Sequence, residues 1–497
     1  MKYLALVVPF VAAVSGCENP DGSTGNASHG TTVGASVADT MIETWPDLDA
    51  TSCGSKCFSL DYTKVPAAPN PKFWEYTNGV PLYALWILYE KTHDARYRDF
   101  VREFADRWID ADGNISYARP FPIGTAPNDS RVQDTMQPTT LLFGLYKEHK
   151  DERYLKAMTN ARNVFPTLSV LKDSEPPKYP PGAFWHKPNY QYQQWLDGVY
   201  MSEPFLVRYG TEHADKISEG DAAKCYSTAT AQIKYAAENT YDPATGLYYH
   251  GWMNDGDPEG NTWFIQGGGL NPANGKVPPV KGTKASNVLW SRSLAWFFVG
   301  TIDTLEHLPE SHPDRDALLD VVKNIANGLK QFQDQETGLW YQVINVRNDA
   351  LPAEGGYPDE GIAAQENWLE TSASALFTYG LAKGVRLGYL RTIYSSVALA
   401  GWNGVRTKID TDAAGKVTVH GTVVGMSLGG TYNAYVNADF RTDLDGGDLP
   451  APASCAEQLS KEPPYHSPPR DCKYVFVRDN VPQGLAAVML ASSEMEY

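Results

Sequence analysis

Apolar and polar positions along the chain describe two kinds of helical segment. From Phe73 onward, apolar residues recur at spacings of three and four, as at Leu82, Leu85, Trp86 and Tyr89, and this period is typical of an α-helix. The chain then turns through EKTHDARY into a second helix that is apolar on one face only. The pattern therefore predicts a hairpin of one apolar and one amphipathic helix.

The same hairpin pattern returns along the rest of the chain. Further copies read LLFGLYKEHKDERYLKAM at 141–158, PFLVRYGTEHADKI at 204–217 and TSASALFTYGLAKGVRLGYL at 371–390, and another runs from Leu294 into LPESHPDRDALLDVV. The segment GLAAVMLASSEMEY closes the chain as a single apolar helix. This gives six apolar helices, and the first five are each followed by a more polar one.

Helices of these two kinds bury the apolar members best when those members form a ring inside the amphipathic ones. We therefore predict an all-α fold, an (α/α)6 barrel over residues 51–497, with long inserted loops at Asn254 to Asn287 and at Arg406 to Asp479. The alternation in KVTVHGTVV predicts a short pair of strands in the second insertion. Parallel inner helices would bring their N-termini, and the residues just before them, to one end of the barrel.

The first 50 residues have a different composition. Lys2 and the apolar run that follows predict a signal peptide over 1–16, and VSGC resembles a bacterial lipobox, which predicts lipid attachment at Cys17. An ordinary secretory signal cut nearby is the alternative. Residues 17–50, rich in small polar residues, are expected to form a disordered tether. We therefore expect an exported protein, in the periplasm or at the cell surface, that meets the membrane only through a lipid anchor.

The charge and the cysteines narrow the possible partners. A net charge of -17 argues against nucleic acid, because a phosphate backbone is not attracted to an acidic surface. With the lipobox cysteine acylated, the preferred disulfide is Cys455 with Cys472, which flank a Pro-rich loop; Cys53 and Cys57 form a second candidate pair, and Cys225 would be free. The CxxxC spacing has no second ligand pair beside it, so we expect no metal.

The stretch from Phe184 to Tyr209 concentrates the candidate chemistry. Asp197 lies at the start of an apolar helix among aromatic residues, and partial burial there is expected to raise the pKa of its carboxyl group toward neutrality, as a proton donor requires. A helix cap is the alternative role for Asp197. Aromatic faces beside polar groups suit a sugar ring, and the stretch contains Trp185, Tyr190, Tyr192, Trp195 and Tyr200.

The segment HKPNYQYQQWLDGVYMSEPFL at 186–206 resembles the signature of glycoside hydrolase family 105, the unsaturated rhamnogalacturonyl hydrolases, and more distantly family 88, the unsaturated glucuronyl hydrolases. The resemblance continues through QDTMQP, GLYYHGW, WSRSLAW, TGLWYQV, ENWLETSASALFTYGLAKGVRLGYL and DNVPQGLAAVMLAS. It implies an (α/α)6 barrel without a cofactor. The implied reaction removes the 4,5-unsaturated uronic acid from the non-reducing end of lyase-generated oligosaccharides, of rhamnogalacturonan or ulvan type.

The resemblance also implies roles for individual residues. Asp197 matches the general acid/base, which protonates C4 of the vinyl ether so that water adds at C5. Asp134 matches the second acidic position and would orient the sugar and help to keep Asp197 protonated. His186 and His250 match site histidines that bind sugar hydroxyls, although a core role is the alternative. The other expected substrate contacts are Arg292 for the uronate carboxylate, the stacking walls Trp195, Trp290 and Trp296, and Gln194.

Two departures from the family pattern bear on specificity. Ser293-Leu294-Ala295 stands where the family commonly has Gly-Asn-Gly, and 423–426 lacks the usual Gly-Thr-Gly. These changes predict a leaving sugar other than the rhamnose of pectin. Two other functions remain open: a sugar epimerase on the same toroid, which would use paired histidines, and a catalytically silent glycan-binding lipoprotein. The presence of both Asp134 and Asp197 favours hydrolysis.

Overall fold

The computed structural model describes residues 32–44, 74–115, 133–168, 182–187, 193–253, 285–286, 288–352, 366–423, 425–426, 432, 436 and 477–497. The unit that contains them runs from Thr32 to Tyr497. The signal peptide, Cys17, and the proposed Cys455–Cys472 disulfide lie outside the described residues and stay predictions. Among the described cysteines, Cys225 is a buried free thiol, as the sequence predicts.

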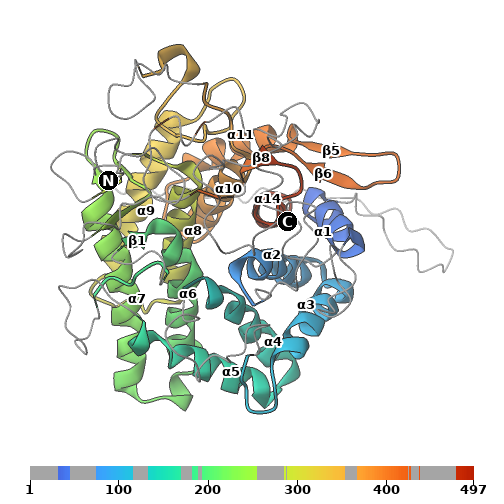
Figure 1. Ribbon diagram of the computed structural model, residues 1–497, viewed down its shortest axis with the longest axis vertical. Helices are drawn as coiled ribbons and strands as arrows, with labels where there is room; N and C mark the ends of the chain where they lie inside the picture. Colours follow the sequence, from blue (N-terminus) through green and yellow to red (C-terminus); the bar gives the residue numbers. More distant parts are fainter. Residues whose placement is uncertain are drawn as a thin grey trace, which may run out of the picture. The chain divides into compact units, whose positions relative to one another are not determined.

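Apolar helices form a closed ring in the described part of the chain (Figure 1). Going round the ring, α2 contacts the 3₁₀ segment η3 and α4, η3 contacts α6, and the contacts continue through α8, α10 and α14 back to α2. The members of the ring are α2 (Tyr76–Thr92), η3 (Gln137–Thr140) with α4 (Leu141–His149), α6 (Leu196–Glu212), α8 (Ser291–His307), α10 (Thr371–Arg386) and α14 (Pro482–Met495). The predicted inner ring is confirmed.

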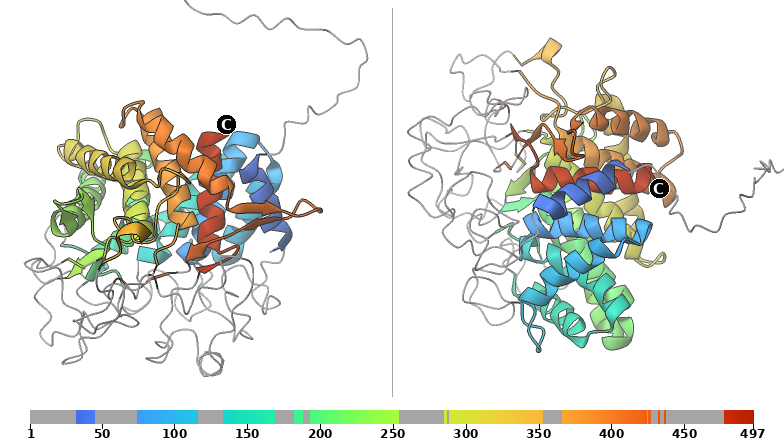
Figure 2. Two further views of the ribbon diagram at one scale, coloured as in Figure 1. Left: turned by 90° about the horizontal axis from the view of Figure 1, so that it is seen from above. Right: turned by 90° about the vertical axis from the view of Figure 1, so that its right-hand side faces the viewer.

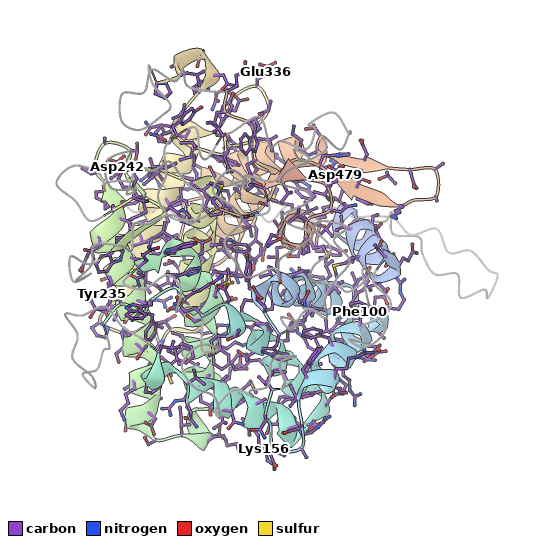
Figure 3. All side chains as sticks on the ribbon, in the orientation of Figure 1. Phe100, Lys156, Tyr235, Asp242, Glu336 and Asp479 are labelled. Atoms are coloured by element: carbon purple, nitrogen blue, oxygen red, sulfur yellow. The ribbon has the colours of Figure 1, made fainter. Side chains whose placement is uncertain are left out.

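Amphipathic helices surround the ring, each against the inner helix that precedes it in the chain. They are α3 (Ala95–Trp108), α5 (Glu152–Arg162), α7 (Glu219–Thr240), α9 (Arg315–Phe332) and α11 (Tyr394–Arg406). In α3, Tyr97, Phe100, Phe104 and Trp108 repeat at helical spacing and are buried, because they form the stripe that faces the inner ring. The exposed Lys156 of α5 lies at the outer edge (Figure 3).

A further helix, α1 (Val33–Thr44), packs against α14 and completes the outer layer (Figure 2). Val37, Ala38 and Met41 are buried in the main core. The backbone N–H of Gly34 donates to Ser492 Oγ at 3.0 Å. The expectation of a disordered tether over 17–50 is therefore wrong for Val33–Thr44. Glycine and small polar residues dominate residues 17–32, directly before the helix, and they obscure the buried residues Val37 and Met41, which lie four positions apart.

The N-termini of the inner helices lie at one end of the ring, as predicted. The segment Trp340 to Val343 connects two of them, because the backbone N–H of Ser291 at the start of α8 donates to Gln342 O, and the N–H of Gln342 donates to Trp368 O just before α10. At the first turns of α2 and α14, Gln483 Nε2 donates to the hydroxyl of Tyr76 at 3.4 Å. Residues that precede the inner helices can therefore converge at this end.

Four of the turns that follow outer helices are built alike. In each, an Asp side chain accepts a hydrogen bond from a backbone N–H two or three residues later, and a glycine three or four residues after the Asp has positive φ. A positive φ suits glycine because it has no Cβ. The Asp–Gly pairs are Asp110–Gly113, Asp242–Gly246, Asp334–Gly338 and Asp412–Gly415. The repeated turn marks where the chain reverses toward the next inner helix.

Short antiparallel strand pairs occupy the connections. They are β1 (Gln193–Trp195) with β4 (Gly251–Met253), β2 (Tyr241–Asp242) with β3 (Leu247–Tyr248), β5 (Ile409–Thr411) with β6 (Val417–Val419), and β7 (Thr422–Val423) with β8 (Val477–Arg478). The two strands predicted in KVTVHGTVV are confirmed as β6 and β7, but each pairs with another strand. Within the described residues, no helix has the length and apolar character needed to span a membrane.

An ion cluster joins α8 and α10 away from these N-termini. The Lys383 ammonium lies 2.7 Å from both Asp303 Oδ1 and Glu306 Oε2, and only 4% of the Lys383 side chain is exposed. A cavity of about 20 Å³ lies beside it, lined in part by Asp303, Glu306, Tyr83 and Tyr200. That volume suits about one water molecule, so this cavity is too small for a sugar.

Candidate active site

Asp197 lies in the first turn of α6, directly after β1. The pairing of β1 with β4 brings the chain at His250 alongside, where the N–H of Leu196 donates to the His250 carbonyl at 3.0 Å. As a result, His250 Nε2 lies 3.3 Å from Asp197 Oδ2. The His250 side chain is fully buried, whereas 13% of the Asp197 side chain is exposed. The strand pair therefore holds a carboxyl group and an imidazole together.

The electrostatic surroundings of Asp197 differ from the expectation. Burial raises the pKa of Asp197, but the His250 ring, and the charge of Arg292 nearby, outweigh burial and leave the pKa below its ordinary value. The prediction of a raised pKa in the free protein is therefore wrong. Burial alone favours the neutral acid, and the sequence does not show which cationic or hydrogen-bonding groups the fold places beside it.

Aromatic rings enclose this pair. His186 stacks on Trp195 with ring centres 4.3 Å apart and an interplanar angle of 10°. The His250 ring contacts Trp195 edge-on at 5.1 Å and Trp290 at 4.7 Å. Burial lowers the pKa of His186 to about 4, so its imidazole is neutral near pH 7. These aromatic rings therefore form one side of the site beside Asp197.

Asp134, in the 3₁₀ segment η2 (Gln133–Thr135), is almost fully buried and is paired. The Lys187 ammonium lies 2.5 Å from Asp134 Oδ2, while 24% of the Lys187 side chain is exposed. The charges of Asp134 and Asp197 both act to raise the pKa of His186, so both carboxylates lie near this ring. In the free protein Lys187 offsets the charge of Asp134, so the predicted effect of that charge on Asp197 stays a prediction for the substrate complex.

Arg292 is buried at the start of α8 and is fixed on three sides. Its guanidinium donates to the backbone oxygen of Val423 and to Ser372 Oγ at 3.4 Å, and it lies 5.1 Å from the centre of the Trp290 ring. Behind it, the buried Glu370 accepts from Ser372 Oγ at 2.8 Å and from the Val423 N–H at 3.0 Å. This frame sets a fixed positive charge near Asp197.

Two of the residues predicted to contact the sugar, Gln194 and Trp296, are instead in contact with other protein side chains. Side chains alternate along a strand, so Gln194 points away from the face that carries Trp195. The Gln194 amide donates to Gln232 at 3.1 Å and accepts from Trp252 Nε1 at 2.7 Å. Trp296 is 1% exposed and packs on Tyr200 in the main core. These two residues therefore support the site from behind.

The departures at Ser293-Leu294-Ala295 also lie inside the protein. All three residues are fully buried, and Ser293 Oγ donates to the Trp290 carbonyl at 3.1 Å. These side chains therefore do not line a sugar pocket, although they directly follow Arg292 in the first turn of α8.

Two residues of the site were missed from the sequence although both lie in the motifs given above. Lys187 is the only lysine or arginine of HKPNYQYQQWLDGVYMSEPFL, which could have marked it as the partner of a buried acid. Glu370 precedes the run TSAS and caps α10, where its side chain accepts from the Ala373 N–H. Glutamate is not one of the residues preferred at this position, so the sequence contains no clear signal for it. Within the described residues, no group of three or more His, Cys, Asp or Glu side chains is arranged to hold a metal ion.

The chain and its fold have known relatives. The family model of Glycosyl Hydrolase Family 88 matches residues 52–263 and 274–446. The unsaturated rhamnogalacturonyl hydrolase YesR of Bacillus subtilis is 23% identical over 65% of this chain and 74% of its own length. Protein Atu3128 of Agrobacterium fabrum is 29% identical over 46% of this chain and 82% of its own length.

Solved structures give the same answer. A glycoside hydrolase of family 105 from C. acetobutylicum superimposes with a TM-score of 0.63 at 25% identity, and the match covers 92% of this chain and 99% of that one. A possible member of family 105 from Salmonella enterica superimposes with a TM-score of 0.60 at 21% identity, covering 93% of this chain and 92% of that one. Because the family model spans most of the barrel, the chain belongs to glycosyl hydrolase family 88 and is a glycoside hydrolase.

Proposed function

We propose that this enzyme removes a 4,5-unsaturated uronic acid from the non-reducing end of oligosaccharides that a polysaccharide lyase releases. The observation that carries the proposal is the placement of Asp197 at the mouth of the ring, 3.3 Å from His250 and close to the fixed charge of Arg292. A uronate offers the two features that this arrangement suits, an enol ether that accepts a proton and a carboxylate that a guanidinium binds.

The proposed reaction begins with transfer of the Asp197 proton to C4. The C4=C5 electron pair forms the new C–H bond, and the positive charge is shared by C5 and the ring oxygen. The Asp197 carboxylate then takes a proton from a water molecule as the water oxygen bonds to C5. The resulting hemiketal opens by cleavage of the bond between C5 and the ring oxygen, and C1 then releases the neighbouring sugar. One water is consumed and Asp197 ends protonated, as it began.

Substrate binding supplies the protonation state that this reaction needs. In the free enzyme His250 and Arg292 lower the pKa of Asp197 against the effect of burial. A uronate carboxylate bound beside Arg292 offsets that positive charge and raises the pKa of Asp197 in the complex. Lys187 is a second cation at the site, and its partial exposure lets it exchange Asp134 for an anionic substrate. We therefore expect activity to be higher at mildly acid than at alkaline pH.

The assay follows the ultraviolet absorbance of the unsaturated uronyl group in lyase digests of pectin, ulvan and glycosaminoglycan. The enzyme is expected to remove the absorbance of at least one digest. Asp197→Asn should lower the rate about 10² to 10⁴-fold, as is typical for a lost general acid. The matched control is Asp320→Asn, since that side chain is 71% exposed on outer helix α9 and should leave the rate unchanged.

Two results would count against the proposal. Full activity of Asp197→Asn would mean that another group donates the proton. Binding of the unsaturated oligosaccharides with no loss of absorbance in any digest would favour a glycan-binding protein without catalysis.

A further inference from the structure

Beyond Asp197, helix α6 contains a second acid that the proposed reaction does not use. This acid, Glu203, has no exposed surface, and it lies among inner helices where water cannot solvate a charge. In the described part of the chain its Oε1 atom has no hydrogen-bond partner. Burial raises the pKa of Glu203 to about 8.

The contacts of Ser202 are all satisfied only when Glu203 carries a proton. Ser202 Oγ accepts from Gln133 Nε2 at 3.1 Å, and it lies 3.3 Å from the Gly198 carbonyl and 2.8 Å from Glu203 Oε2. A serine hydroxyl has one proton and two lone pairs. It therefore cannot donate to both the carbonyl and a carboxylate. If Glu203 is protonated and donates to Ser202, the serine donates to Gly198 and every one of the three contacts is satisfied.

This chain of hydrogen bonds ends beside both candidate catalytic acids. Gln133 directly precedes Asp134, and Gly198 directly follows Asp197. The amide of Gln133 lies so close to Gly198 that a Cβ there would be 2.4 Å from Gln133 Oε1. Gln133, Ser202 and Glu203 are each 2% exposed or less. The contact therefore fixes η2 against the first turn of α6 without help from solvent.

We propose that Glu203, as a neutral acid, is a positioning residue that locks Ser202 and Gln133 in place and so sets Asp134 in register with Asp197. A carboxylate at this position would be a buried charge with no cation among the groups that act on it. Ser202 would then donate to the carboxylate and lose its hydrogen bond to the Gly198 carbonyl. The groups that act on Glu203 are uncharged: they are Ser202, Gln133 and the Glu203 backbone itself. On the neighbouring η2 and α8, the buried charges of Asp134, Arg292 and Asp303 are directed to other partners.

The first test measures how firmly Glu203 holds Ser202 and Gln133 in place, which we call the lock, and it does not depend on activity. Hydrogen exchange of the peptide segment 133–140 is compared in the wild type, Glu203→Gln and Glu203→Met. The amide group in Glu203→Gln is still a donor and cannot ionise, so exchange should stay near the wild-type rate. Glu203→Met keeps the volume but removes the donor, and exchange should become at least tenfold faster. Equal exchange in all three proteins would overturn the lock.

The second test follows thermal unfolding from pH 5 to pH 9. The pKa of Glu203 is about 8 in the folded chain and near its ordinary value of 4.5 in the unfolded chain. The neutral Glu203 side chain therefore contributes its full stabilisation below pH 4.5, and this contribution is lost as the pH rises to about 8. The midpoint of Glu203→Gln should therefore rise relative to the wild type across this window. Glu212→Gln, on the same helix but partly exposed, is the control and should show no such trend. A constant difference between Glu203→Gln and wild type would show that Glu203 is ionised.

The third test uses the proposed reaction and rests on it. Glu203→Met should lower kcat about ten- to a hundredfold with little change in KM, because small displacements of reacting groups cost rate more than binding. Glu203→Gln should keep kcat within about twofold of wild type near pH 6. Asp197 makes kcat fall at alkaline pH in both proteins, but the fall near pH 8 should be smaller in Glu203→Gln than in the wild type. If Glu203→Met loses stability but keeps kcat, the residue is only structural and the positioning role is wrong. If the wild type acts on no digest, the proposed function fails, while the first two tests still decide the lock.

Discussion

The effect of Met41→Ala on stability distinguishes a packed helix α1 from a disordered tether. Met41 is 1% exposed and lies in the main core, next to α14. The change removes about three heavy atoms from a buried site. At about 0.8 kcal/mol for each buried methylene, the transfer term is about 2 kcal/mol, and incomplete closure of the cavity brings the expected loss to about 2–4 kcal/mol.

The assay is thermal unfolding at neutral pH, followed by circular dichroism. The entropy of unfolding is about 2 cal/mol/K per residue, so for a barrel of some 450 residues a loss of 2–4 kcal/mol lowers the midpoint by about 2–4 °C. Glu43→Ala is the matched control, because Glu43 is on the exposed face of the same helix and should shift the midpoint by less than about 0.5 °C.

A disordered segment before the barrel gives a different result. In that case neither substitution has a partner in the folded state, and the two midpoints coincide with that of the wild type. Identical midpoints for Met41→Ala and Glu43→Ala would therefore refute the packing of α1 against α14. A loss larger than about 5 kcal/mol would show that Met41 supports more of the core than its own contacts.

Three further predictions concern stability. Lys383→Met should cost about 3–5 kcal/mol in urea unfolding because it leaves Asp303 buried without its cation, and adding Asp303→Leu should recover most of the loss; no recovery would contradict the pairing. The pKa of His186 is depressed to about 4, so the wild type should lose stability as the pH falls from 6.5 to 4, by up to about 1.4 kcal/mol per pH unit, and His186→Gln should flatten this slope. Gly338→Ala should be about 1–3 kcal/mol more destabilising than Gly388→Ala, since both have φ of +76° but only at Gly338 would a Cβ meet a backbone carbonyl, at 2.2 Å; equal midpoints would contradict this contact.

The barrel could be read from the sequence because inner and outer helices bury different fractions of their surface. The stripe of α3 repeats at helical spacing, while α8 is buried on nearly every side and is apolar throughout. The sequence also contains the repeated Asp–Gly pairs, such as Asp242–Gly246 and Asp334–Gly338. Their role as turns became clear only from the structure, in which each turn follows an outer helix. The α1 stripe is too short to stand out without its partner α14.

The sequence motif located the site but did not give the distances and contacts within it. Asp197 and His250 were both predicted, yet their separation of 3.3 Å depends on the pairing of β1 with β4, which joins residues more than fifty positions apart. Trp290 and Trp296 look alike in the sequence. The first contacts His250, whereas the second is in the core, because the two lie on different parts of α8 and its N-cap.

By itself, the sequence determined the elements, their order and the acid at the mouth of the ring, because helical periodicity and local motifs act over a few neighbouring residues. Only the tertiary structure decided the protonation states. The pKa of Asp197 is lowered by His250 and Arg292 against the effect of burial, the charge of Asp134 is met by Lys187, and burial raises the pKa of Glu203. Electrostatic energies depend on distance through space, and the fold sets those distances between residues that are far apart in the chain.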